Sequence, residues 1–199
     1  MQITCFGNGS RQGTYALFIV LSKELSIAFG KFLGGRQFLL EPGCYMYIGS
    51  ALGNKSASMP LARRLVRHAS RSNGSTPHEL RDHMVRFFQK SSLAGPGLQP
   101  PSQKKLRWHI DYLLDSQHAQ IVRILIIRSP DRLETALSQL ASSLEETFII
   151  AQGLGAGDVR NSTHLLGVKS LESCFNALER TIPSLINTGN GKQANRFDS

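Results

Sequence analysis

The sequence predicts one mixed α/β domain of the α+β type, in which a small, mostly antiparallel central sheet is flanked by helices. A chain of 199 residues is long enough to bury one well-filled core, and two independent domains are not expected. Short apolar runs separated by turn residues occupy the N-terminal part, which is typical of antiparallel strands. From Pro60 onward, apolar residues recur at helical spacing instead.

Four short runs of aliphatic and aromatic residues predict strands over residues 15–21, 26–32, 37–40 and 44–48. Gly34-Gly35 and Glu41-Pro42-Gly43 separate the later runs, and these residue types favour turns. An antiparallel meander is the arrangement that such runs indicate. Two further strands are expected at 120–127 and 164–168, the first of them a buried apolar run.

The first helix is expected to begin at Pro60, a residue that suits the first turn, and its apolar stripe is Leu61, Ala62, Leu65, Val66 and Ala69. A second basic helix is expected at 78–90, a flexible loop at 91–103 and a short helical or extended element at 108–114. Ser129-Pro130-Asp131 is expected to cap the next helix. The last helix is expected at 171–186, and the polar residues 188–199 predict a disordered tail.

The charge of the chain favours a polyanionic partner. Its formal net charge is +9 and its pI is near 9.9, and Lys and Arg gain affinity when they displace the counterions of phosphates. A merely soluble basic protein is the alternative, but nucleic acid is the preferred interpretation. The candidates for phosphate contacts are Arg63, Arg67, Arg71, Lys104 and Lys105.

The cysteines and the apolar runs indicate a compartment. Cys5, Cys44 and Cys174 are few, odd in number and widely spaced, so neither a disulfide framework nor a Cys-x-x-Cys site is predicted. A reducing cytoplasm is the expected location. Residues 1–10 lack the pattern of a secretory signal, and the apolar runs are too short or too interrupted to cross a bilayer, so no membrane partner is expected.

Tyr15 and Tyr47 are expected on strands beside a basic helix, where Arg64 and His68 lie four residues apart and share a face. Hydrolysis of a phosphodiester needs a base for water and positive charge for the developing phosphorane. A tyrosine serves as that base only if nearby positive charge lowers its pKa from about 10, and Arg64 and a metal-bound water are candidates for that charge. The alternative is that Arg64 is one more solvated charge.

Glu134 is the candidate metal ligand, because Mg²⁺ in such sites is held by one or two carboxylates together with substrate oxygens and water. It is expected in the first turns of the capped helix, beside the apolar stripe. The alternative is an acidic residue that complements the positive N-terminus of the helix.

The segment Trp108-His109-Ile110-Asp111-Tyr112 places an indole, an imidazole, a carboxylate and a phenol within five residues. His109 is a candidate to orient a phosphate or to polarise a tyrosine, with Asp111 holding it in position. A structural His-Asp pair is the alternative. The glycine-rich residues 153–158 have the wrong spacing for a dinucleotide fingerprint, and we expect a tight loop that brings Asp158 and His164 toward the site.

These residues resemble the GIY-YIG nuclease superfamily. Gly13-Thr14-Tyr15 resembles its first motif with Thr in place of the usual Ile, Tyr47-Ile48-Gly49 matches the second, and Arg64 followed by His68 resembles its helix motif. The resemblance implies a three-stranded antiparallel sheet flanked by helices. It also implies that Tyr15 or Tyr47 helps to activate water, that Arg64 faces the scissile phosphate, and that Glu134 binds a single Mg²⁺ or Mn²⁺ ion.

The closer resemblance is to a largely uncharacterised prokaryotic branch of that superfamily, sometimes fused to endonuclease III-like DNA glycosylases. Five motifs in the same order carry it over residues 12–168, and they lie at 43–51, 64–68, 108–113, 134 and 153–165. The spacing between Tyr15 and Tyr47 implies an added hairpin, and residues 72–103 are treated as an insertion. Val159 and Asn161 stand where many members have cysteines, which argues against a metal-binding role for that loop.

The expected function is a metal-dependent endonuclease that hydrolyses DNA phosphodiester bonds in DNA repair or processing. Branched or damaged DNA and repair proteins are the expected partners. One alternative is a nucleic-acid-binding module of the same fold without turnover. Another is a small-molecule enzyme that uses His109 and Asp111, which predicts a closed apolar pocket in place of an open basic cleft.

Overall fold

The computed structural model describes residues 2–7, 9–53, 58–155 and 162–194, the last eight of these by their backbone alone. Its centre is a six-stranded sheet with the order β1-β6-β2-β5-β8-β7. The strands are β1 (Ile3–Phe6), β2 (Gly13–Leu21), β5 (Gly43–Ala51), β6 (Ala119–Ile127), β7 (Thr147–Ile149) and β8 (Leu165–Val168). All neighbouring pairs are antiparallel except β1 with β6. The predicted fold class, a mostly antiparallel sheet flanked by helices, is confirmed.

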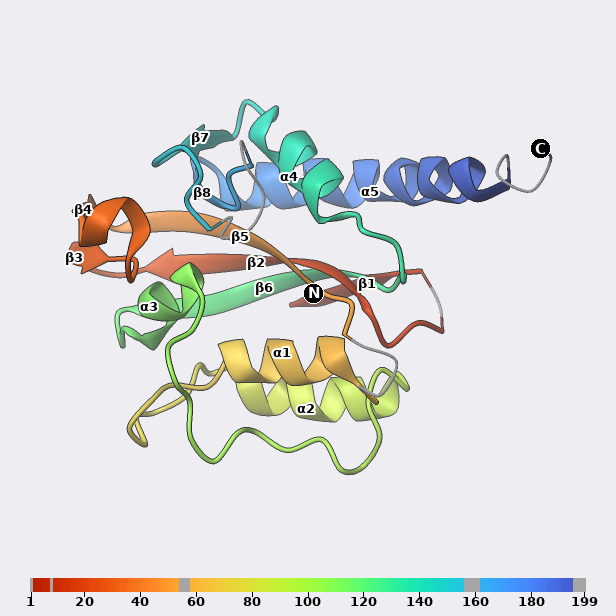
Figure 1. The fold of residues 1–199 in the computed structure, drawn as a ribbon, viewed down its shortest axis with the longest axis horizontal. Helices are drawn as coiled ribbons and strands as arrows, with labels where there is room; N and C mark the ends of the chain where they lie inside the picture. The colour runs from red at the N-terminus through yellow and green to blue at the C-terminus, as the bar shows by residue number, and fades with distance from the viewer. Residues whose placement is uncertain (1, 8, 54–57, 156–161, 195–199) are drawn as a thin grey trace.

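Helices cover both faces of this sheet (Figure 1). On one face lie α1 (Pro60–His68), α2 (Arg81–Lys90) and α3 (His109–Asp115), and on the other lie α4 (Glu134–Ser142) and α5 (Leu171–Ala194). The alternation of side chains along β2 supplies both cores, because Tyr15 and Leu17 pack into the first while Ala16 and Phe18 pack into the second. The central strand is therefore apolar at nearly every position.

The first strands do not form the predicted meander. β2 pairs directly with β5 along its whole length, from Gly13 opposite Ala51 to Leu21 opposite Gly43. Between them, β3 (Leu25–Ala28) and β4 (Gln37–Leu40) form a separate two-stranded sheet, joined through the short 3₁₀ element η1 (Phe32–Gly35). The added hairpin is thus present, but the prediction that consecutive strands pair throughout was wrong. Two long apolar strands bury more surface together than either buries against a four-residue strand.

Several boundaries also differ from the predicted ones. The edge strands β1 and β7 were not predicted, because strands of three or four residues carry little periodicity. The helix predicted after Ser129-Pro130-Asp131 begins only at Glu134, because Ser129 Oγ accepts the Asp131 N–H in a local turn before the helix.

The disordered tail was predicted to begin at residue 188, whereas the backbone of α5 continues to Ala194. An established helix gains one hydrogen bond for each residue added, which favours its extension into polar sequence. Residues 195–199 lie outside the described part of the chain.

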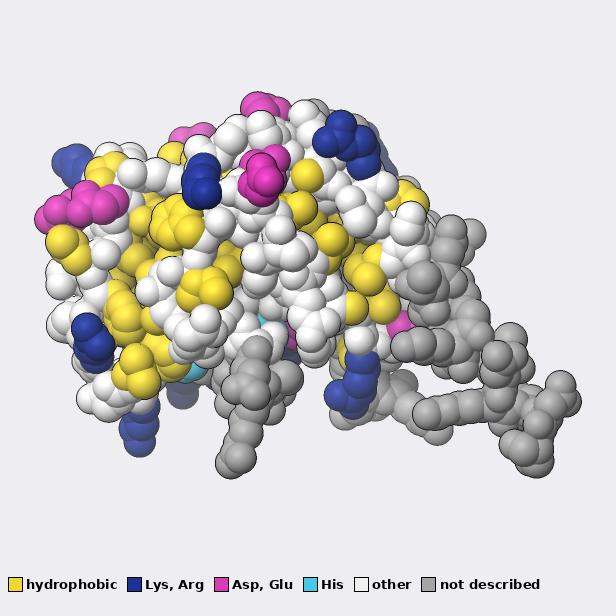
Figure 2. Space-filling model, turned by 90° about the horizontal axis from the view of Figure 1, so that it is seen from above, with side chains coloured by type: hydrophobic (Ala, Val, Ile, Leu, Met, Phe, Trp, Pro, Cys, Tyr) yellow, Lys and Arg dark blue, Asp and Glu magenta, His cyan; other side chains and the backbone are white. Residues whose placement is uncertain are grey.

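The predicted insertion at 72–103 contains α2 and a connecting loop, as expected. The loop is anchored, because Leu93 and Leu98 are fully buried in the core beneath α1 and α2. On the opposite side of the molecule, apolar side chains gather at the end where β3, β4 and β7 lie (Figure 2). Within the described ranges, no helix has both the length and the apolar character that crossing a bilayer requires.

Candidate active site

Tyr15 and Tyr47 lie side by side on β2 and β5, with their ring centroids 6.4 Å apart. Gly49 makes this arrangement possible, because it pairs with Tyr15 across the strands and carries no side chain. A Cβ atom at Gly49 would lie 2.5 Å from the Tyr15 hydroxyl and 3.0 Å from Tyr47 Cε1. The glycine of the Tyr-Ile-Gly sequence therefore leaves the space into which both rings fold.

His68 joins the tyrosines from the last turn of α1. The apolar stripe of α1, which includes Leu61 and Leu65, packs on the sheet and turns His68 toward β2. Its Nε2 atom lies 2.8 Å from the Tyr15 hydroxyl, and both side chains are buried. On the other side of the ring, Nδ1 lies 3.5 Å from Asp111 Oδ1. A carboxylate beside Nδ1 favours the proton there, so we assign Nε2 as the acceptor of the Tyr15 O–H.

Asp111 is a buried carboxylate with several donors. Arg67 donates to both of its oxygens at 2.8 Å, and the backbone N–H groups of Arg107 and Trp108 donate at 2.8 and 2.9 Å. Burial raises the pKa of Asp111, but the contacts with His68, Arg67 and the Trp108 N–H outweigh it and hold that pKa well below its usual range. Asp111 is therefore ionised behind His68.

Burial is the largest influence on the pKa values of His68 and Tyr15, which share a hydrogen bond. It lowers the pKa of His68 to about 4, although Asp111 opposes the shift. It raises the pKa of Tyr15 well above its ordinary value, with Tyr47 adding to the rise and Arg64 opposing it. Arg64 alone therefore does not lower the pKa of Tyr15, because desolvation of the fully buried phenol exceeds the effect of Arg64.

Arg64 and Glu134 meet through Ser50 at the end of β5. The Ser50 hydroxyl donates to Glu134 Oε2, and Arg64 Nη1 donates to the Ser50 carbonyl. His164 Nδ1 lies 3.0 Å from Glu134 Oε1. Burial raises the pKa of Glu134, but His164 and Ser50, followed by Arg64, more than offset it and lower that pKa. The result is an ionised, partly exposed carboxylate beside a guanidinium.

Trp108 supports the arginines of α1. The guanidinium carbons of Arg64 and Arg67 each lie 4.4 Å from the centroid of its ring, which is cation–π geometry. His68 packs on the same indole, with ring centroids 5.7 Å apart. Trp108 thus fixes the directions in which Arg64 points to Ser50 and Arg67 points to Asp111.

His109 lies apart from this cluster. Its ring packs on Phe32 at 5.2 Å, and its Nδ1 accepts the Gly155 N–H at 3.3 Å. Burial lowers the pKa of His109. The prediction that Asp111 holds His109 was wrong, because residues two apart on a helix point in different directions and Asp111 contacts His68 instead.

The five predicted phosphate-binding residues divide into two groups. Arg63 and Lys105 are exposed, and Arg67 is partly exposed while it pairs with Asp111. Arg71 and Lys104 are buried. Their charged groups donate to backbone carbonyls, Arg71 to Thr76, Ser116 and Ala119, and Lys104 to Ser70. A long basic side chain fills such a position when carbonyls of neighbouring segments converge on it.

Sequence reasoning missed two members of the site. Ser50 links Arg64 to Glu134, and Arg67 orients Asp111, although it was predicted to contact phosphate. Both residues could have been identified from their positions in the sequence, since Ser50 directly follows Tyr-Ile-Gly and Arg67 lies one helical turn from Arg64. The expected approach of His164 to the site is confirmed. Asp158 lies outside the described residues.

Glu134 fits the role of a ligand for a hard divalent cation. The carboxylate is ionised and 26% exposed, and each oxygen has more than one lone pair, so Ser50 and His164 do not saturate it. Mg²⁺ is commonly held by one or two carboxylates, with substrate phosphates and waters completing its shell. The donor chemistry at this position is therefore compatible with one such ion.

The fold and the cluster define an α+β domain with two buried tyrosines, a His-Asp contact, and an arginine and a carboxylate linked through Ser50 at one end of its central strands. The chain belongs to the family described as domain of unknown function DUF123, whose family model matches residues 14–187. That span contains every residue of the cluster. A search of curated proteins and a search of solved structures found no match.

Proposed function

We propose that this protein is a metal-dependent endonuclease that hydrolyses DNA phosphodiester bonds, as its resemblance to GIY-YIG nucleases implies. The observation that carries the proposal is the hydrogen bond between Tyr15 and His68, with the Asp111 carboxylate 3.5 Å from the other ring nitrogen of His68 and with Arg64 and Glu134 joined through Ser50 close by. These groups supply a proton acceptor, a positive charge and a metal-binding carboxylate, which are the requirements of phosphodiester hydrolysis.

Tyr15 and His68 act as a coupled base in this proposal. A water molecule gives its proton to the Tyr15 oxygen as the Tyr15 proton passes to His68 Nε2, and the resulting hydroxide attacks phosphorus while the leaving oxygen departs. Burial lowers the pKa of His68 to about 4, so the ring is neutral near pH 7 and Nε2 has a lone pair for that proton. The same low pKa makes His68 a weak base, and the transfer therefore depends on stabilisation of the imidazolium. Ionised Asp111 stabilises the imidazolium that forms. Transfer through the hydrogen bond avoids a free phenolate, which the raised pKa of Tyr15 disfavours.

Arg64 and Glu134 act on the phosphate. The Arg64 guanidinium offers positive charge to the developing phosphorane, and Trp108 keeps it in place. Glu134 would hold one Mg²⁺ or Mn²⁺ ion, which when bound supplies Lewis-acid stabilisation of the phosphate charge. His164 and Ser50 orient the Glu134 carboxylate.

The chemistry of the chain supports DNA as the partner and the cytoplasm as the location. The net charge of +9 and the exposed Arg63 and Lys105 favour attraction of a phosphate backbone. Branched or damaged DNA and repair proteins remain the proposed context. Cys5, Cys44 and Cys174 are free thiols, which suits a reducing compartment.

A nicking assay tests this proposal. Purified protein is incubated with plasmid, single-stranded and branched DNA in the presence of Mg²⁺, Mn²⁺ or EDTA. We expect metal-dependent nicking that Glu134→Ala and Arg64→Ala reduce by at least about a hundredfold. Glu145→Ala, in the turn after α4, and Arg86→Ala, on α2, remove the same charges at exposed positions, and these variants should cut normally. Nicking that survives in Glu134→Ala would contradict the proposal.

The burial of Tyr15 favours one other function, a nucleic-acid-binding module without turnover. Tyr15 is fully covered and its pKa is raised, so water reaches its hydroxyl only if the surrounding side chains move. This alternative predicts DNA binding that weakens steeply with salt, together with no cleavage of any of the substrates in either metal.

A further inference from the structure

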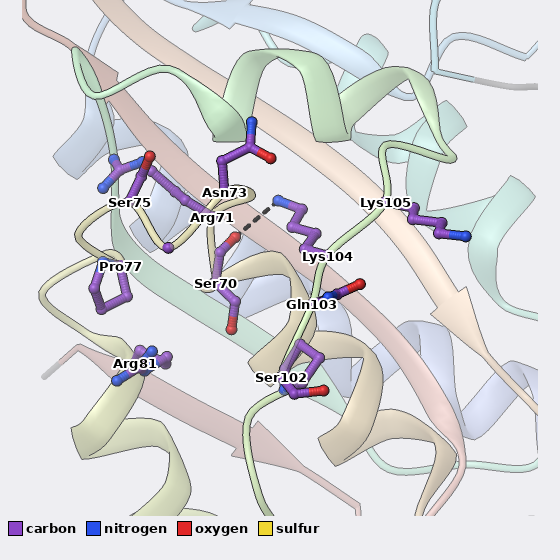
Figure 3. Close-up of a pocket in the computed structure, with 12 residues that line it drawn as sticks. Ser70, Arg71, Asn73, Ser75, Pro77, Arg81, Ser102, Gln103, Lys104 and Lys105 are labelled. Carbon is purple, nitrogen blue, oxygen red and sulfur yellow. Dashed lines mark hydrogen bonds between the residues drawn. The ribbon is translucent and has the colours of Figure 1, made fainter.

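A polar pocket of about 700 Å³ lies beyond the C-terminal end of α1, and neither Tyr15 nor Glu134 lines it. The loop that contains Ser70 and Ser75 forms one wall, and the segment that contains Ser102 and Lys104 forms another (Figure 3). The first residue of α2, Arg81, completes the lining. The second of these walls belongs to the predicted insertion at 72–103 and the two lysines that follow it.

The lining of this pocket is electropositive. Its charged residues are two arginines and two lysines, Arg71, Arg81, Lys104 and Lys105, and within the described residues no carboxylate lines it. Figure 3 shows Lys105 pointing away from the other three. Its remaining polar side chains are hydroxyls and amides that donate hydrogen bonds. Those of Asn73, Ser75, Ser102 and Gln103 make no hydrogen bond within the described part of the chain.

Arg71 is the cation with the least compensation. It is 7% exposed, and its guanidinium donates to three backbone carbonyls, those of Thr76, Ser116 and Ala119. Among the described residues no carboxylate forms an ion pair with it. Carbonyl dipoles solvate the guanidinium but do not neutralise its charge, and Asp115 acts on it electrostatically without forming an ion pair. A buried charge that is only partly compensated is costly. An anion in the pocket would reduce that cost.

Lys104 and Arg81 differ from Arg71 in their compensation. The Lys104 amine donates to the Ser70 carbonyl at 2.8 Å and lies 4.0 Å from Asp111 and 3.9 Å from Asp115, so two carboxylates balance it. Arg81 is partly exposed, and among the described residues it forms an ion pair only with its neighbour Asp82. Such an exposed pair is weak, so the Arg81 guanidinium is free to turn toward a ligand.

We propose that this pocket binds the phosphate group of a nucleotide-sized ligand. Its volume lies within the range of small-molecule sites, and its donors and cations match phosphate oxygens. Prolines are the only apolar side chains that line it within the described residues, so there is no aromatic surface for a base to stack on. The pocket therefore recognises phosphate and sugar without reading the base. The ligand is either a free mononucleotide or a terminal residue of a nucleic-acid strand.

Titration calorimetry and amide NMR of the full chain in EDTA test the proposal. The probes are AMP, CMP, adenosine and a short 5′-phosphorylated oligonucleotide. AMP and CMP should bind within about threefold of each other, adenosine should not bind, and the amide signals of Gly74, Ser75 and Gln103 should shift. Binding of adenosine equal to that of AMP, or shifts elsewhere with none at these amides, would overturn the proposal.

A matched pair of substitutions on α2 distinguishes phosphate binding in the pocket from non-specific attraction to the positive charge of the protein. Arg81→Gln, at the pocket, should weaken binding of the phosphate probes about tenfold. Arg86→Gln removes the same charge from an exposed position on the same helix, outside the pocket, and should change it less than about twofold. Equal losses in the two variants would refute the proposal.

Two further arms identify the ligand and separate this site from the proposed nuclease. Affinity for the 5′-phosphorylated oligonucleotide that exceeds that for AMP assigns the pocket to a strand end, and the reverse order assigns it to a free mononucleotide. Because the measurement omits divalent metal, Glu134→Ala should bind the phosphate probes as the unmodified protein does. The phosphate-binding proposal can therefore be confirmed or refuted independently of DNA cleavage.

Discussion

At the scale of single residues, Gly49 determines whether two tyrosines can lie in adjacent strands beside one histidine. Most glycines in a chain serve a turn, but Gly49 lies within β5 and is buried. The absence of a side chain is what allows the Tyr15 hydroxyl to occupy that position and reach His68. The Tyr-Ile-Gly sequence therefore has a packing explanation that holds whatever the chemistry of the site.

Gly49→Ala should destabilise the protein and displace Tyr15 from His68. The new methyl group would lie 2.5 Å from the Tyr15 hydroxyl, so a ring must move within a filled core. Overpacking of this kind costs about 1–3 kcal/mol, which urea unfolding measures. Gly43→Ala is the control, because Gly43 begins the same strand and its Cβ would meet nothing within 4 Å. Equal stability of the two variants would contradict this account of Gly49.

Asp111→Asn tests the buried ion pair behind His68. The substitution leaves the Arg67 guanidinium without its bidentate carboxylate and removes the charge beside His68 Nδ1. Removal of one partner from a buried pair costs about 3–5 kcal/mol, so unfolding by urea should shift strongly. Asp82→Asn breaks the exposed pair with Arg81 and should change stability by less than about 1 kcal/mol. Similar effects of both substitutions would mean that Asp111 is solvated in solution.

At the scale of elements, the loop at 91–103 shows how far composition can mislead. Its prolines and glycines predict a flexible connection, but Leu93 and Leu98 are fully buried among the side chains of α1 and α2. The loop thus closes the bottom of the first core and leads the chain to Lys104 and α3. Periodicity cannot show this, because a loop buries isolated residues instead of a regular stripe.

Leu98→Ala should therefore behave as a core substitution. Truncation of a fully buried leucine removes its transfer free energy and leaves a cavity, at a cost of about 2–5 kcal/mol. Limited proteolysis should then cut between residues 91 and 103 faster than in the unmodified protein. The matched control is Leu39→Ala on β4, where the leucine is 59% exposed. A loss of stability no greater for Leu98→Ala than for Leu39→Ala would support a mobile loop.

At the scale of the whole molecule, the sequence predicted the helices and strands that depend on neighbouring residues, but it did not predict contacts between segments that are far apart in the chain. The apolar stripe of α1 and the buried strand β6 lie within short windows, so their periodicity was sufficient. The contact of Tyr15 with His68 joins residues that are far apart in the chain, and only the matched motifs brought them together. The sequence gives the charges of Arg71 and Lys104, but it does not predict their burial, because the carbonyls that accept their hydrogen bonds belong to other segments.

Two buried histidines predict how the stability of the whole protein depends on pH. His78 is buried, its Nδ1 accepts the Ile121 N–H, and its Nε2 lies 2.9 Å from the Leu114 carbonyl, so it is held in the neutral form. Burial lowers the pKa of His78 to about 3 and that of His68 to about 4, from an ordinary value of 6.5. Between pH 6.5 and these values the unfolded chain binds protons that the folded protein does not, so the free energy of unfolding falls as the pH falls. The loss from the two histidines should be on the order of several kcal/mol near pH 4.

Urea unfolding at pH 7.5, 6, 5 and 4 measures this loss of stability. His78→Gln should reduce the dependence of the free energy of unfolding on pH, while His83→Gln, at an exposed position, should leave that dependence unchanged. A free energy of unfolding that is constant from pH 7 to 4 would show that these histidines are solvated.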